Sequence, residues 1–176
     1  MKFVIQDTIP YAVEQVYEVQ RERLSELAPY LSNIDSIIVK ERRDEPGKVH
    51  FVNLWNARAG EIPTAIRAFV KPEMFRWTDH ATWFLDDQSC DWRTVLGFFP
   101  EAIICHGHNT WRAKGSQTEV TINGEIVVHA DKIGVPRLLA KSASEAVEKL
   151  VVRTIEPNLR KTNEGVTAFI RKQQGG

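Results

Sequence analysis

The feature that most constrains this chain is a long run of segments in which apolar and polar residues alternate, one after another along the sequence. A side-chain period of two is that of a β-strand with one buried and one exposed face. The turns between these segments are short and polar, such as the Pro46–Gly47 pair. Consecutive strands joined by short turns predict an antiparallel meander. The predicted strands cover residues 35–43, 49–57, 74–85, 90–99, 102–113 and 118–130.

The segments before and after this run complete the expected fold. Residues 2–9 alternate and predict a first strand, and two short helices follow, one after Pro10 and one at 25–31. Residues 136–172 carry apolar residues at spacings of three and four, which predicts a long amphipathic helix with a kink at Pro157. A half-buried sheet needs a cover, and this helix can supply it. We therefore expect an α+β fold in which a long C-terminal helix covers one face of an antiparallel sheet.

The composition narrows the class of protein. We expect one domain over residues 1–173, with a frayed tail at 174–176. The formal net charge is zero, which argues against a nucleic-acid partner. No apolar run reaches the roughly 20 residues needed to span a bilayer, and no signal peptide is recognisable, so a cytoplasmic location is expected. The two cysteines, Cys90 and Cys105, are expected to be free thiols.

The face of the sheet that should point inward is more mixed than an ordinary core. Tryptophan and phenylalanine share this parity with several polar residues and with Gly107 and Gly124, which are expected to leave space. Large aromatic side chains with a few polar groups are typical of a ligand cavity. In the alternative interpretation, the polar residues pair within a solid core, or one strand is shifted by a residue, which would reverse its faces. The predicted inward residues that would contact a ligand are Phe51, Asn53, Trp55, Trp77, Asp79, Trp83, Trp92, Thr94, Asn109 and Trp111.

Three stretches resemble a known superfamily. They are IDSIIVKERRDEPGKVHFVNLWNA, EIPTAIRAFVKPEMFRWTDHATWF and GEIVVHADKIGVPRLLAKSASEAVEKLV. Their order resembles the helix-grip fold of the START and polyketide-cyclase superfamily, also called SRPBCC. The resemblance implies a curved antiparallel sheet wrapped around the long C-terminal helix. Within it, the chain is most similar to PRELI-like lipid-transfer domains and to uncharacterised bacterial relatives.

The resemblance implies a carrier that binds or transfers a lipid or another hydrophobic molecule in a cavity between the sheet and the C-terminal helix. It implies transient membrane contact as one mode of action, and it brings no cofactor and no catalytic motif. The helix would close the cavity, and the insertion at Ile62–Val70 would act as a lid, with Ile66 and Phe69 as a flap. The helix residues predicted to contact the ligand are Val147, Leu150 and Val151.

A metal site and a catalytic thiol each compete with a purely structural interpretation. His106 and His108 lie two apart on a predicted strand and so share a face, with His80 as the best third ligand. Alternating polar residues are also what the outer face of a sheet carries, and we expect no metal. Cys90 and Cys105 lack a base or a positive neighbour in the predicted inward set, so we expect unreactive thiols.

Acid–base catalysis is the enzymatic alternative. Asp79 lies between Trp77 and Trp83 on the predicted inward face, and a desolvated carboxyl has a raised pKa. An enzyme of the polyketide cyclase or aromatase type, acting on a hydrophobic substrate, would use Asp79 as its general acid or base. In the structural interpretation, Asp79 pairs with an arginine or a backbone donor, or lies at the rim of the sheet. We favour a binding protein over an enzyme.

Overall fold

A computed structural model describes residues 1–58, 76–97, 100–129, 132, 145 and 160–175. The described strands form one antiparallel sheet, and two helices lie between its first and second strands. A further helical segment covers residues 160–173. The elements are β1 (Lys2–Ile9), α1 (Val13–Glu22), the 3₁₀ helix η1 (Leu24–Tyr30), β2 (Ile34–Glu45), β3 (Lys48–Ala57), β4 (Arg76–Phe84), β5 (Ser89–Leu96), β6 (Ile103–Lys114) and β7 (Gln117–Val128).

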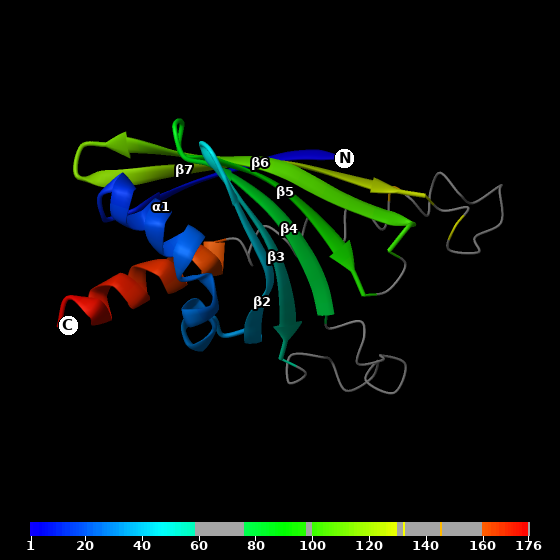
Figure 1. Cartoon of the computed structure of the whole chain (residues 1–176), viewed down its shortest axis with the longest axis horizontal. Helices are drawn as coiled ribbons and strands as arrows, with labels where there is room; N and C mark the ends of the chain where they lie inside the picture. The colour runs from blue at the N-terminus through cyan, green and yellow to red at the C-terminus, as the bar shows by residue number, and fades with distance from the viewer. Residues whose placement is uncertain (59–75, 98–99, 130–131, 133–144, 146–159, 176) are drawn as a thin grey trace.

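The order of the strands explains why the helices lie across the sheet. The order is β1-β7-β6-β5-β4-β3-β2, so β1 and β2, although consecutive in the chain, form opposite edges. The chain from β1 to β2 passes through α1 and η1, which carry it from one edge to the other. Figure 1 shows α1 and the C-terminal segment on the same side of the bent sheet. These helices therefore cover the concave face.

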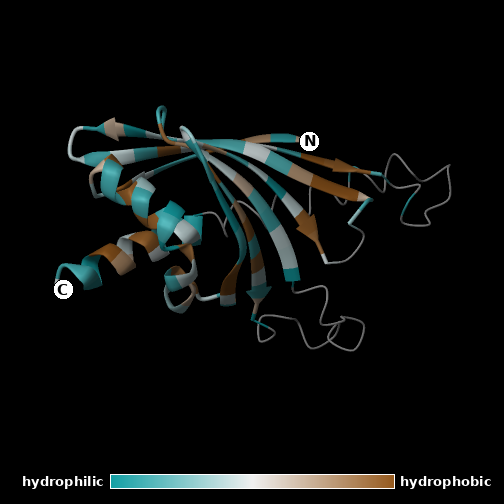
Figure 2. Ribbon diagram, in the orientation of Figure 1, coloured by the Kyte–Doolittle hydropathy of each residue, from teal (hydrophilic) through white to brown (hydrophobic). Residues whose placement is uncertain are grey.

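Helix α1 packs because its apolar residues recur at helical spacing. Val13, Val16 and Tyr17 are buried, as is Gln20, whereas Glu14 is exposed. Figure 2 shows this mixture of hydrophobic and hydrophilic residues along the helix and along the strands of the sheet. The helix ends before η1, which contains Pro29 and runs on to the edge strand β2.

The C-terminal segment packs against η1 and the chain that follows it. The Phe169 ring meets the Tyr30 ring edge-on, with centroids 5.5 Å apart. A Cβ atom added to Gly165 would lie 2.5 Å from a methyl carbon of Leu31. Glycine at this position allows the close approach of the helix to Leu31.

A chain of buried polar side chains ties the helices to the sheet. Trp111 Nε1 of β6 donates to Gln20 Oε1 of α1 at 2.5 Å. Gln20 Nε2 donates to Asn163 Oδ1 of the C-terminal segment at 3.4 Å. Asn163 Nδ2 in turn donates to the Asp7 carboxylate of β1 at 3.0 Å. The hydrogen bonds therefore join two elements from the start of the chain, β1 and α1, to β6 and to the C-terminal segment.

A second tie holds the β2–β3 hairpin to α1. Irregular pairing between Val39 and Glu41 shifts the faces of β2. Arg42, opposite Phe51, lies with its guanidinium over the Phe51 ring, 5.2 Å from the ring centroid. Its Nη1 also contacts the Glu22 carboxylate at 2.6 Å. The bulge thus turns a basic side chain of the edge strand toward the helix.

The α+β helix-grip arrangement predicted from the alternation and the resemblance is confirmed. Each predicted strand is present, and the two short helices follow β1 as expected. Of the predicted helix at 136–172, the structure describes only Glu145 and residues 160–172, all helical, so the kink at Pro157 lies outside the described residues. The predicted insertion at Ile62–Val70 also lies outside them. None of the described helices combines the length and the apolar character needed to cross a bilayer.

Replacing Asn163 by alanine should destabilise the fold. The change leaves the buried Gln20 amide without its acceptor and removes one of the two donors to the Asp7 carboxylate, which also accepts from the Thr8 N–H. A buried polar group that loses its partner typically costs about 1–3 kcal/mol. Urea unfolding should show a lower midpoint with an unchanged slope. The exposed neighbour Glu164, changed to alanine, is the control and should shift the free energy of unfolding by less than about 0.5 kcal/mol. Equal midpoints for Asn163→Ala and Glu164→Ala would contradict the role of the polar chain.

Candidate ligand-binding site

The register of the antiparallel strands places the inward residues in rows that run across the sheet. A residue's cross-strand neighbours share its face, with side chains about 5 Å apart. The candidate site comprises two such rows toward the end of the sheet where β3 ends and β4 begins. One row contains Asn53, Asp79 and Thr94, and the next contains Trp55, Trp77 and Leu96.

Asn53 and Asp79 form the polar centre of the site. Asn53 is 1% exposed, and its Nδ2 lies 3.5 Å from Asp79 Oδ2, at the outer limit of a hydrogen bond. Asn53 Oδ1 is buried and accepts no hydrogen bond. A buried amide oxygen without a donor costs free energy, so this atom needs a partner that the described side chains do not provide.

Asp79 is half-buried, and its surroundings also perturb its carboxyl. Loss of solvent raises the pKa of its carboxyl from 3.8 to about 6, and the hydrogen bond from Asn53 opposes this only in part. No arginine or lysine among the described residues offsets the charge, since Arg76 and Arg93 are exposed and project from the opposite face of β4 and β5. Pairing with an arginine, the structural interpretation of Asp79, is therefore absent from the part of the chain that the structure describes.

Two tryptophans stand next to this polar pair. Trp55 and Trp77 are directly opposite in the register, and their rings stack at 5.6 Å between centroids with 15° between planes. Trp55 Nε1 is buried and donates to no acceptor. A buried indole N–H usually finds a partner. The site therefore offers an aromatic surface, one unused donor and unused acceptors.

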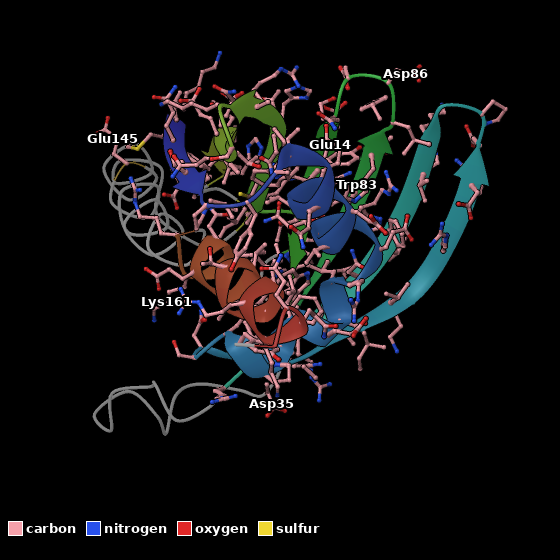
Figure 3. All side chains as sticks on the ribbon, turned by 90° about the vertical axis from the view of Figure 1, so that its left-hand side faces the viewer. Glu14, Asp35, Trp83, Asp86, Glu145 and Lys161 are labelled. Atoms are coloured by element: carbon pink, nitrogen blue, oxygen red, sulfur yellow. The ribbon has the colours of Figure 1, made fainter. Side chains whose placement is uncertain are left out.

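Trp83 and Trp111, two other predicted ligand contacts, lie farther along the sheet under α1. Their rings stack at 5.1 Å, and the Tyr17 ring of α1 meets each of them edge-on at 5.3 Å. Figure 3 shows Trp83 beside α1 on the inner side of the sheet. Both side chains belong to the main packed core. Trp55 and Trp77 are only partly buried and pack against this core rather than within it.

The two inward glycines do not leave space, contrary to the prediction. A Cβ atom on Gly107 would lie 2.4 Å from the Trp92 ring, and one on Gly124 would lie 2.1 Å from the Phe3 ring. Each glycine is therefore covered by an aromatic ring from a neighbouring strand. Asn109, predicted as a handle for the ligand, accepts the hydrogen bond of Trp92 Nε1 at 2.7 Å and so holds that ring over Gly107.

The remaining described residues predicted to contact a ligand lie outside the two rows of the site, except Thr94. Phe51 is buried in the main core beneath Arg42, and Thr94 is half-buried opposite Asp79. Val39 lies opposite Asn53 on β2 and so shares the face of the site. It was not predicted there, because the irregular pairing of β2 interrupts the alternation of its side chains. The predicted flap residue Phe69 and the predicted helix contacts Val147, Leu150 and Val151 lie outside the described residues.

The two cysteines are buried free thiols, as expected. Burial raises the pKa of Cys105 to about 12, and the nearby Asp79 charge adds to this shift. Burial raises the pKa of Cys90 well above 9, again with a contribution from Asp79. Both thiols are protonated near neutral pH and are poor nucleophiles.

The histidines lie on the outer face. The His106 and His108 side chains are 48% and 44% exposed, and they face different carboxylates, Glu125 at 3.7 Å and Asp91 at 2.7 Å. Arg93 lies between His80 and His106 in the register, which separates the two histidines by two strand spacings, or roughly 10 Å. Within the described residues, no three His, Cys, Asp or Glu side chains gather as metal ligands.

The chain shares its fold with solved structures of low sequence identity. A Thermus thermophilus protein is 18% identical, with a TM-score of 0.65, over 96% of this chain and 98% of that one. The Zhui aromatase/cyclase from Streptomyces sp. R1128 is 12% identical, with a TM-score of 0.66, over 98% and 94%. A START superfamily protein from Mycobacterium smegmatis is 11% identical, with a TM-score of 0.58, over 96% and 98%.

These similarities confirm the START-like helix-grip fold. No protein-family model matches the sequence, and no curated protein matches it. None of the three structures is named as a PRELI-like domain, so that closer resemblance stays a prediction. At such identities the likeness extends to the fold alone.

The raised pKa of Asp79 predicts a pH-dependent effect on stability. The folded state holds the Asp79 proton more tightly than the unfolded state, so ionisation of this carboxyl destabilises the fold as pH rises from about 4 to 6. Asp79→Asn should therefore be more stable than wild type above about pH 6, by about 2 kcal/mol, and the gain should vanish below about pH 4. Chemical unfolding across this range measures it.

The control for this experiment is Asp35→Asn, because Asp35 is an exposed carboxyl of β2. It should leave the pH profile unchanged. A gain for Asp79→Asn that is the same at every pH would contradict a perturbed carboxyl.

Proposed function

We propose that this protein binds a hydrophobic small molecule or lipid between the concave face of the sheet and its helices. The observation that carries the proposal is the group of unsatisfied polar atoms beside stacked aromatic rings. Asn53 Oδ1 and Trp55 Nε1 are buried without partners, and Asp79 has only a long contact to Asn53. Ligand sites combine apolar and aromatic walls with a few polar groups that orient the bound molecule.

The division of the inner face supports the same function. Elsewhere on the inner face, the aromatic and polar side chains satisfy one another, as in the contacts of Trp111 with Gln20 and of Trp92 with Asn109. Asn53 Oδ1 and Trp55 Nε1 have no such partners. Because a folded chain normally pairs its buried polar groups, two unpaired atoms that lie together on the inner face favour a site whose partner comes from outside the chain.

Transfer of the bound molecule between membranes is the finer form of this proposal. The concave face would shield an apolar molecule from water, and binding and release would require transient contact with a membrane. The polar atoms at Asn53, Trp55 and Asp79 would hold the polar end of the molecule, and the stacked indoles would contact its apolar body. Co-purification of a lipid, seen by native mass spectrometry and identified after organic extraction, would support a carrier.

A test with a defined probe uses the neutral dye N-phenyl-1-naphthylamine and protein stripped of bound lipid. Wild type should bind the dye and quench its own tryptophan fluorescence. Trp77→Ala should weaken binding about tenfold, because it removes one ring of the stacked pair. Thr78→Ala is the matched control, since Thr78 lies between Trp77 and Asp79 but projects from the outer face, and it should bind as wild type does. Equal affinities for wild type and Trp77→Ala would contradict this site.

The carboxyl of Asp79 also favours a second function. A pKa of about 6 allows a group to give and take a proton near neutral pH, as a general acid or base does. One structural neighbour is named as an aromatase/cyclase. If this chain is an enzyme, Asp79→Asn should abolish turnover of a hydrophobic substrate while the ligand still binds, since asparagine keeps the shape but cannot transfer the proton. Retained turnover in that variant would exclude Asp79 as the catalytic residue.

A further inference from the structure

The site contains both hydrogen-bond acceptors and a donor without partners, and their relative numbers indicate which kind of ligand group could bind there. Asn53 Oδ1 is a buried acceptor that receives no hydrogen bond. Asp79 presents a carboxylate whose side-chain contact is the long one from Asn53 Nδ2. Against these acceptors stands one unused donor, Trp55 Nε1. The row across β3 and β4 therefore lacks donors more than it lacks acceptors.

The charge of the site also favours a ligand group that donates hydrogen bonds. An ionised carboxylate in a water-poor region is stabilised most by a positive charge within hydrogen-bonding distance. The basic residues nearest in register, Arg76 and Arg93, project from the convex face. Among the described residues of the concave face, the Cys90 and Cys105 thiols feel the charge of Asp79, and neither thiol is a cation. An anionic ligand end would meet repulsion here, and a neutral hydroxyl would supply a single donor.

The neighbouring row adds a surface suited to a cation. Trp55 and Trp77 stack one residue pair beyond Asn53 and Asp79 on the same face, about 7 Å along the strands. The face of an indole ring attracts cations more strongly than that of other aromatic side chains. A positive group near Asp79 would lie beside this surface.

We propose that the polar end of the bound molecule is a protonated amine that donates hydrogen bonds to the Asp79 carboxylate and to Asn53 Oδ1. This inference rests on the proposed function and specifies the ligand class, a hydrophobic amine whose apolar body contacts the tryptophans. An ammonium group has three N–H donors and a full charge, so it satisfies both acceptors at once. Trp55 Nε1 then donates a hydrogen bond to an oxygen elsewhere on the same molecule.

The test compares two probes of the same shape, naphthylethylamine and naphthylethanol, by isothermal titration calorimetry at about pH 7.5, where the amine is protonated. Wild type should bind the amine about tenfold more tightly than the alcohol, the size expected of one charge-assisted hydrogen-bonded pair. In Asp79→Asn the amine should fall to the affinity of the alcohol, while the alcohol binds as before. Asn53→Leu keeps the volume and removes the second acceptor, and it should reduce the preference severalfold.

The control is Asp91→Asn, which removes an equal charge one strand away on the outer face and should leave the preference intact. Thermal unfolding of each variant verifies folding. If wild type binds both probes equally, or if Asp79→Asn keeps the preference, the amine inference is overturned while hydrophobic binding stands. If neither probe binds wild type, the proposed binding function itself fails, and the inference fails with it.

Discussion

The arrangement of this fold depends on the buried hydrogen-bonded chain from Trp111 through Gln20 and Asn163 to Asp7. These contacts join β6, α1, the C-terminal segment and β1; the contacts of Gln20 with Trp111 and with Asn163 are buried, and the contact of Asn163 with Asp7 is part-buried. When one of these hydrogen bonds is broken, its buried partner is left unsatisfied and the desolvation cost of that partner is no longer offset. The hydrogen bonds therefore stabilise this half of the molecule together. The helices lie over the half of the inner face that contains Trp83 and Trp111, and that half is packed as a core. The candidate site lies along the rest of the face.

The candidate site, unlike this hydrogen-bonded chain, contains groups that destabilise the folded state. A desolvated carboxyl with a pKa near 6 and two buried polar atoms without partners all destabilise the folded state. Folded proteins retain such groups where binding or chemistry uses them. The stacked Trp55 and Trp77 keep the surroundings apolar, which strengthens any electrostatic contact formed there. A ligand that satisfies Asn53 and Asp79 would therefore bind and stabilise the fold at the same time.

Much of the fold could be predicted from the sequence, because an antiparallel strand records its two faces as alternation. That pattern placed Asn53, Asp79 and Trp77 inward and His106 outward. It could not tell a ligand contact from a core contact, since Trp77 and Trp83 have the same parity and differ only in what covers them. Gly107 was misjudged because the ring that covers it, Trp92, comes from a neighbouring strand. The hydrogen-bond partner of Trp111, Gln20, lies 91 residues away in a sequence that shows no signal for the pairing.

Among the described residues, Asp79 is a carboxyl of the candidate site without a cationic partner. A carbon-13 NMR titration of the Asp79 carboxyl, in protein stripped of lipid, measures this most directly. We predict a midpoint near 6, against an ordinary value of 3.8, and a fall in that midpoint when a hydrophobic amine is bound, because the positive charge favours the ionised carboxylate. A midpoint near 3.8 that does not move on adding the amine would contradict the account.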